Sequence, residues 1–406
     1  MKKILLLLNN GAAFRDFFEL IELLRKNYYL SIVIPNKENY CNNIKFNTLD
    51  YNIIKFTRFK LISLILIKNI KILRSLFIIK FILNKILRID NNLIEKFKEF
   101  DLLITPTPRY YYDMIFLLIF KILKKPSLMI VSSWDNLLKG SLRGDADYYT
   151  VWNEKMLNQA IVYHHKKKEN VFVTGSINHD IFFHKELFFK RSEYLNGSNV
   201  NKKIILLGTS GLFRNLREYE LFEHIIKILD NQNFIFIIRF HPSETINGIP
   251  EKFLLLKKSN VLFDYSNNIL PGFSEKNSWY MEPKEKIRVG NILSISDIVM
   301  SVGSTISVEA CIFGTPSLII GYHPNQKSKF KNILYPWYKK HLKDVIGDDK
   351  IPLIKNDNDL EKYFYAYINN RQNFKKNAEQ VVKTVFYYTD GLSNNRTFNI
   401  INNILK

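Results

Sequence analysis

A chain of 406 residues can form two domains of ordinary size, each with its own hydrophobic core. Its 59 Lys and Arg residues outnumber 38 Asp and Glu residues, and the net charge of +21 favours an anionic partner: nucleic acid, an acidic membrane surface or a phosphate-bearing substrate. An AT-rich genome would produce the same lysine excess. Two cysteines and no His/Cys cluster at metal-binding spacing argue against a disulfide framework and a structural zinc site, and indicate a reducing cytoplasm.

The chain opens with MKKILLLLNNG, whose short apolar run predicts a first strand. The run ends at Leu8, short of the roughly 7–15 apolar residues of a signal peptide, and no small-residue cleavage site follows. No later stretch reaches the roughly 18 uninterrupted apolar residues of a membrane-spanning helix. We therefore expect a cytoplasmic protein.

Residues 60–88 are apolar and basic and contain no acidic residue. Their Lys and Arg residues recur at helical spacing and leave a wide face of Leu, Ile and Phe. This pattern fits helices that lie on an anionic membrane surface, and it also fits two amphipathic helices that cover a sheet. Peripheral contact with the inner face of the membrane is therefore one of two interpretations.

Short apolar stretches alternate with amphipathic ones along the chain, beginning with KILLLL, FRDFFELIELLRK and YLSIVIP. This alternation predicts βαβ units and parallel sheets covered on both faces. The polar stretch 191–203 indicates a linker between a first Rossmann-like domain at 1–190 and a second Rossmann-like domain at 204–375, and 376–406 are closing helices. The predicted class is α/β: two doubly wound domains face a cleft, and the C-terminal helices close back on the first domain.

Open α/β sheets bind ligands at the carboxyl ends of their strands, so the loops that follow strands are the most informative. The strand IILLG leads into a Gly-Ser turn whose amides could approach an anion and an arginine that could neutralise it: Gly208, Ser210, Gly211 and Arg214. The strand FIFII leads into RFHPSE, where Pro242 restricts His241 to an extended backbone. His241 could donate to a phosphate oxygen or act as an acid, although a lone histidine is more often structural.

A third loop, SVGSTISVEA, follows the strand DIVM. Gly303, Ser304 and Thr305 would form the first turn of a helix, where free amides and the helix dipole favour phosphate. Ser304 or Thr305 could also cap the helix for structural reasons alone. Glu309, about one turn further on, is placed to accept hydrogen bonds from a ribose diol. The three loops together predict half of a nucleotide site.

The order of RFHP and DIVMSVGSTISVEACIFGTP resembles the carboxyl-terminal domain of GT-B glycosyltransferases. The Ser-x-x-x-Glu-Ala helix is similar to that of the peptidoglycan N-acetylglucosamine transferases, whose Glu binds the ribose; the resemblance implies this role for Glu309. The HP pair and the Ser/Thr turn resemble bacterial sialyltransferases, capsule Kdo transferases and CDP-glycerol glycerophosphotransferases. This second resemblance implies that His241, Ser304 and Thr305 contact the nucleotide phosphates.

Three departures from these families bear on the chemistry. The acidic motif that supplies the base in many bacterial sialyltransferases is not evident, and Gly-Ser-Thr replaces the Ser pair of the glycerophosphotransferases. GTSGLFRN stands where the UDP-N-acetylglucosamine 2-epimerases, which share the fold, have an RREN-type stretch. This last difference disfavours an epimerase.

The first half contains SSWDNLLKG, VWNEKMLNQAI and VFVTGSINHD, which resemble the amino-terminal domain of GT-B proteins from surface-polysaccharide loci. An inverting transferase needs a base near the acceptor hydroxyl, and Asp135 is the first candidate, although an Asx turn would explain it as well. Trp134 could stack on a sugar or simply pack. Together with Asn136 and Lys139 it forms the expected acceptor side.

His179 and Asp180 lie at the end of the next strand and are second choices for the base. The DAD sequence at 145–147 imitates a metal-binding motif, but it precedes a strand instead of following one. We interpret it as a polar turn and expect no metal and no cofactor.

These observations predict a metal-independent glycosyltransferase that moves a sugar from a nucleotide-activated donor to a surface-polysaccharide or lipid-linked acceptor. One alternative is a CDP-glycerol-type glycerophosphotransferase, and a less favoured one is an enzyme similar to the UDP-GlcNAc 2-epimerases. A basic nucleic-acid-binding protein is a third, but the positive charge concentrates in apolar helices without a platform of aromatic and basic residues, so we expect no specific nucleic-acid partner.

Overall fold

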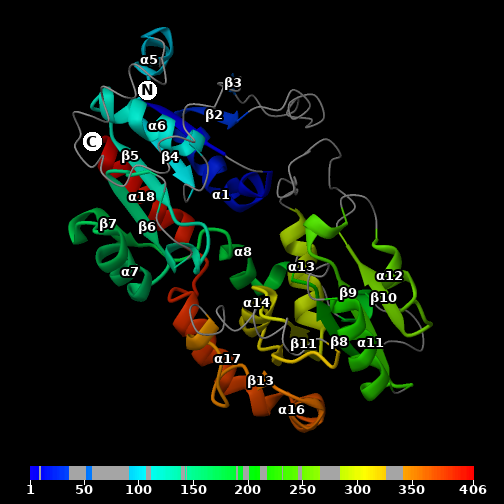
Figure 1. Ribbon diagram of the computed structural model, residues 1–406. Helices are drawn as coiled ribbons and strands as arrows, with labels where there is room; N and C mark the ends of the chain where they lie inside the picture. Colours follow the sequence, from blue (N-terminus) through cyan, green and yellow to red (C-terminus); the bar gives the residue numbers. More distant parts are fainter. Residues whose placement is uncertain are drawn as a thin grey trace.

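The structure is a computed structural model. It describes residues 1–8, 11–35, 52–56, 91–106, 111–138, 142, 144–188, 191–194, 201–210, 217–230, 232–245, 249–265, 284–325 and 342–406. Two parallel sheets form the centres of two domains, which stand side by side (Figure 1).

The first sheet has seven strands in the order β3-β2-β1-β4-β5-β6-β7, all parallel. The strands are β1 (Lys3–Leu7), β2 (Tyr29–Pro35), β3 (Asn52–Phe56), β4 (Leu102–Pro106), β5 (Ser127–Ile130), β6 (Tyr148–Val151) and β7 (Val171–Val173). Its helices are α1 (Gly11–Asn27), α5 (Asn91–Phe97), α6 (Tyr111–Ile122) and α7 (Glu154–His164). The central strands are continuous apolar runs because helices cover both faces of such a sheet.

The second sheet has six parallel strands in the order β10-β9-β8-β11-β12-β13. They are β8 (Lys203–Gly208), β9 (Phe234–Arg239), β10 (Val261–Asp264), β11 (Ile298–Ser301), β12 (Ser317–Ile320) and β13 (Leu353–Ile354). The flanking helices are α11 (Glu218–Leu229), α12 (Glu251–Leu254), α13 (Lys284–Ile295), α14 (Ile306–Ile312) and α16 (Asp357–Asn369). The strand order reverses between β8 and β11, and a doubly wound sheet binds its ligand outside such a switch point.

Short helices α8 (Asp180–Phe183) and α9 (Arg191–Tyr194) follow β7, and α8 packs against α13 of the second domain. Arg191 of α9 donates to Asp297 at 2.8 Å, so this segment already contacts the second domain before β8 begins. The domain limits at 190, 204 and 375 stay predictions.

The C-terminal helices run back across the molecule (Figure 1). Helix α17 (Gln372–Val385) packs on α14, and α18 (Ser393–Leu405) packs on α1. Ile401 and Leu405 are buried in the same apolar cluster as Leu20 and Leu24 of α1. The predicted fold class is thereby confirmed, including the return of the C-terminal helices to the first domain.

Within the described ranges, no helix has both the length and the hydropathy needed to cross a membrane. The basic segment 60–88 lies outside the described residues.

Candidate active site

A cavity of about 280 Å³ lies between the two domains. In the first domain its lining comes from helix α1 and from the segments that follow β5, β6 and β7. In the second domain it comes from the ends of β8 and β9 with their loops, from the turn and helix that follow β11, and from the start of α13. The carboxyl ends of both sheets therefore face one space, which is where this architecture binds ligands.

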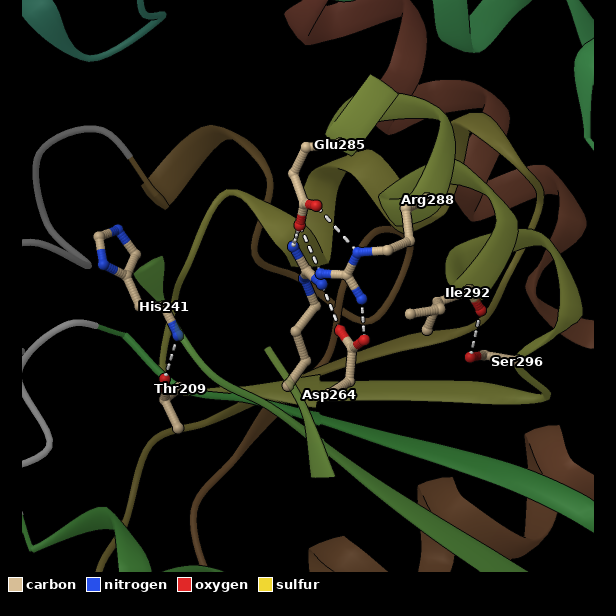
Figure 2. A network of polar contacts seen from close by, with 8 residues as sticks. Thr209, His241, Asp264, Glu285, Arg288, Ile292 and Ser296 are labelled. Carbon is tan, nitrogen blue, oxygen red and sulfur yellow. Dashed lines mark hydrogen bonds and ion pairs between the residues drawn. The ribbon is translucent and has the colours of Figure 1, made fainter. Parts of the chain in front are cut away.

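The loops after β8 and β9 are tied together by Thr209. Its hydroxyl accepts the backbone N–H of His241 at 2.7 Å and donates to Glu244. Thr209 and His241 both line the cavity, and Figure 2 shows the Thr209–His241 contact. The sequence predicted each of these two loops as an anion-binding candidate on its own. In the structure the hydrogen bonds of Thr209 hold the two loops together.

Gly208 permits the close approach of β8 to α14. A Cβ atom at Gly208 would lie 2.9 Å from Cγ2 of Ile306, the first residue of α14. Both residues line the cavity, so this glycine sets how near the helix start comes to the end of the strand.

The turn after β11 is held by Ser301, whose Oγ accepts the N–H groups of Gly303 and Ser304 at 3.3 and 3.1 Å. Gly303 has φ of +96°, in the region that favours glycine. Thr305 is the N-cap residue of α14 but makes no side-chain capping bond. Ser304 and Thr305 line the cavity instead. The structural cap predicted as the alternative role is thus not formed by Thr305.

Arg239 lines the cavity and is held by an ion-pair network. Figure 2 labels the other three members of this network, Asp264, Glu285 and Arg288. Arg239 pairs with Asp264 and, at 3.3 Å, with Glu285, and Arg288 donates to both carboxylates. Burial opposes the ionisation of Glu285, but the hydrogen bonds and charges of the two arginines hold its pKa below the ordinary value. Two cations and two anions balance, so the network fixes the position of Arg239 without adding net charge.

His241 is neutral at neutral pH. Burial, followed by the charges of Arg15 and Arg239, lowers its pKa to about 4. A neutral imidazole can still donate a hydrogen bond to a phosphate oxygen, so the predicted phosphate contact would be a hydrogen bond and not an ion pair.

Three cations lie around the same space: Arg15, Arg239 and Lys286. Arg15 follows β1 and pairs with its neighbour Asp16 at 2.7 Å. Lys286 lies on α13, donates to the carbonyl of Asn178 at 2.6 Å and stands 3.8 Å from Asp16. Sequence reasoning did not assign Arg15 or Lys286 to the site. For Arg15 a signal existed, because it lies near the start of α1, the helix that follows the first strand.

Glu309 also lines the cavity, in the first turn of α14. Its Oε1 lies 3.1 Å from Nε2 of His179, which reaches across from the first domain. His179 was a second choice from the sequence, and the structure places it at the cavity wall.

Of the predicted acceptor-side residues, Trp134 and Asn136 are described, and neither lines this cavity. Ser132 and Ser133 line the cavity, whereas Asp135 is 7% exposed and accepts from the hydroxyl of Ser133 at 2.8 Å. Trp134 lines a separate small hollow beside α7. Asn136 is buried in the short turn that follows.

The remaining predicted residues are elsewhere. Ser210 donates its N–H to Glu218 and does not line the cavity. Gly211, Arg214 and Lys139 lie outside the described residues. Five of the predicted site residues therefore line the same cavity: Gly208, His241, Ser304, Thr305 and Glu309.

The DAD segment is an irregular polar segment that leads into β6. Asp145 accepts from Tyr149 at 2.8 Å, and Asp147 accepts from the N–H and the hydroxyl of Ser127. Among the described residues, no group of three or more His, Cys, Asp or Glu side chains could hold a metal ion. Metal independence stays a prediction, because other parts of the chain are not described.

No family model matches the sequence, and the search of curated proteins found no match. Solved structures do resemble the fold. UDP-GlcNAc 2-epimerase from Neisseria meningitidis bound to UDP-GlcNAc has a TM-score of 0.58 at 14% identity, with 98% of this chain and 99% of that chain covered. The wall teichoic acid polymerase TagF has a TM-score of 0.57 at 11% identity, with 100% and 89% covered.

HepE from Anabaena in complex with UDP has a TM-score of 0.55 at 10% identity and covers 99% of each chain. The likenesses extend over both domains. They confirm the predicted GT-B fold, and at these identities they show the fold alone.

Proposed function

We propose that this chain is a GT-B glycosyltransferase that transfers a sugar from a nucleotide-activated donor to a surface-polysaccharide or lipid-linked acceptor. The observation that carries the proposal is the convergence of His241, Ser304, Thr305 and Glu309 on one interdomain cavity of about 280 Å³. Each comes from a loop or helix start at the carboxyl end of the second sheet, where a nucleotide is expected.

The charges support a phosphate-bearing ligand. Lys286 and Arg15 are cations at the cavity wall, and the hydroxyls of Ser304 and Thr305 are available there. In the proposed reaction these groups and the neutral His241 stabilise the leaving phosphate in place of a metal ion. Glu309, about one turn along α14, binds the ribose.

The neighbouring folds support a nucleotide ligand without fixing the chemistry. One is described as bound to UDP-GlcNAc and another as in complex with UDP. A third is a teichoic acid polymerase, which keeps the glycerophosphotransferase alternative open. The lipid-linked acceptor would be met at the inner face of the membrane, with 60–88 as the candidate contact.

The acceptor base stays a proposal with two candidates. Asp135 is the candidate from the sequence. It does not line the cavity itself but accepts a hydrogen bond from Ser133, which does. Asp16 lines the cavity but is paired with Arg15. Comparing single-turnover rates of D135N and D16N at saturating donor would separate them, since a lost base slows the chemical step.

The function is tested with a panel of UDP-, CMP- and CDP-activated donors. We expect release of one nucleotide to depend on an added glycan or lipid-linked acceptor, and H241A and E309Q to reduce that release by at least about tenfold. E379Q is the matched control, because Glu379 is exposed on α17, far along the chain from the cavity loops.

Other outcomes decide against the transferase. CMP release from a CDP-glycerol donor would establish the glycerophosphotransferase. Conversion of UDP-GlcNAc without an acceptor would establish an epimerase. Full activity of both H241A and E309Q would show that the nucleotide lies elsewhere.

A further inference from the structure

His179 forms a direct polar contact between the first domain and the nucleotide half of the cavity. Its Nε2 lies 3.1 Å from Oε1 of Glu309, and the two side chains are only 4% and 19% exposed. A carboxylate accepts hydrogen bonds and cannot donate them, so Nε2 carries the proton in this contact. A largely buried, charge-assisted hydrogen bond is stronger than one in water.

His179 is itself held in place on its other side. Its Nδ1 lies 2.7 Å from the hydroxyl of Ser176. The rings of Trp152, Phe386 and Phe182 surround the imidazole, with centroid distances of 5.2, 4.9 and 5.7 Å. The imidazole therefore has little freedom to rotate, and it presents one fixed donor to Glu309.

The order Ser176–His179–Glu309 has the connectivity of a Ser-His-acid triad, but the burial argues against nucleophilic catalysis. Ser176 is 2% exposed and is not among the residues that line the cavity. A substrate carbonyl or phosphorus could not reach its Oγ, so the chain of bonds has another purpose.

We propose that His179 is a positioning residue that fixes the carboxylate of Glu309 for ribose recognition and so makes nucleotide affinity depend on the first domain. This rests on the proposed function, in which Glu309 binds the ribose. His179 occupies Oε1, and among the described residues Oε2 has no recorded partner. Oε2 is thus left for the ribose hydroxyls, and the orientation of the carboxylate is set before the ligand arrives.

The contact between His179 and Glu309 joins the two domains. His179 is in the loop between β7 and α8, and Glu309 is on α14. A second contact, from Lys286 to the carbonyl of Asn178, holds the same loop against α13. The ribose carboxylate is therefore oriented by a side chain that can leave if the domains separate.

The test measures affinity by calorimetry for UDP, CDP and CMP, each with its 2′,3′-dideoxy analogue. Wild type is compared with H179F, which fills the aromatic surroundings without a donor, and with H179Q, which keeps an N–H near the place of Nε2. H184Q is the matched control, because His184 is on the next turn and is more exposed. Thermal unfolding is measured for each variant.

We expect H179F to weaken binding of the best ribonucleotide about tenfold and to leave the dideoxy analogue unchanged, since only the diol uses Glu309. H179Q should retain most of the affinity, and E309Q should reproduce the H179F result. Equal losses of affinity for the ribonucleotide and the dideoxy analogue in H179F would overturn the proposal, because a general structural defect weakens both ligands alike. If H179F does not fold, H179L takes its place: a loss confined to the ribonucleotide supports the proposal, and unchanged binding or equal losses for both ligands overturn it.

These results are separable from the proposed function. If wild type binds none of the nucleotides, the proposed function fails and this proposal fails with it. If wild type binds a nucleotide and E309Q alone loses the ribose preference, the function stands and the role of His179 is refuted.

Discussion

Lys286 shows how a single residue can make a binding site sensitive to pH. It lines the interdomain cavity with its side chain 12% exposed, and this burial lowers its pKa to about 8, with Asp16 opposing and Arg15 adding to the shift. Below about pH 8 the ammonium is charged and attracts a phosphate; above that value it becomes neutral. A bound phosphate stabilises the charged form and moves the transition to higher pH.

We therefore expect nucleotide affinity to fall as the pH rises from about 7 to about 9.5, by about tenfold at the upper end. K286R should keep the affinity over this range because arginine stays protonated, and K286M should be weak and nearly independent of pH. Calorimetry at several pH values checks this, with K284M at the exposed start of the same helix as control. A wild-type affinity that does not change with pH would contradict the assignment of Lys286 to the phosphate.

The residues that sequence reasoning found share one property: they follow an apolar strand directly. His241, Ser304 and Thr305 are in such loops, and parallel strands end at the same edge of a sheet. Lys286 follows no strand and reaches the cavity from a helix, so its place depends on packing between domains. Asp135 was in the right loop, but its side chain turns to Ser133, a rotamer choice that no sequence pattern specifies.

At the scale of elements, the start of α14 is positioned by β8. Residues of both line the cavity, and the apolar side chain of Ile306 packs over Gly208, where a Cβ atom would come within 2.9 Å of Cγ2. Strand and helix types were predictable from apolar runs and small-residue turns. The close approach of α14 to β8 was not predictable, because it depends on the missing Cβ atom of Gly208.

G208A should push α14 outward and weaken nucleotide binding about tenfold, with a stability loss of about 1–3 kcal/mol from overpacking. The double variant G208A/I306A removes the clashing methyl group and should recover much of the affinity lost in G208A, compared with I306A alone. Affinity and urea unfolding are measured for all three. Additive effects in the double variant would mean that Gly208 and Ile306 do not act through this contact.

At the scale of the whole molecule, the C-terminal segment connects the far end of the chain to the cavity loop. Asn394, at the start of α18, donates its backbone N–H to Asp180 at 2.7 Å and its side chain to Asp180 and to the carbonyl of Ile177 at 2.9 Å. Asp180 is 1% exposed and follows His179 directly. The alternation of strands and helices predicted both domains and the return of the tail, but not which tail residue holds the loop, because that contact joins residues 214 positions apart.

Removing this connection should affect stability and the cavity together. D180A leaves the buried backbone N–H of Asn394 without its acceptor, at a cost of about 1–3 kcal/mol, and frees the loop that presents His179. We expect a lower urea midpoint and weaker nucleotide binding, with D180N intermediate because it keeps one acceptor oxygen. D390A, in the same tail but half exposed, should change neither quantity by much, since exposed ion pairs contribute little. If D180A loses stability but binds nucleotide as tightly as wild type, the tail supports the fold alone and the His179 loop does not depend on it.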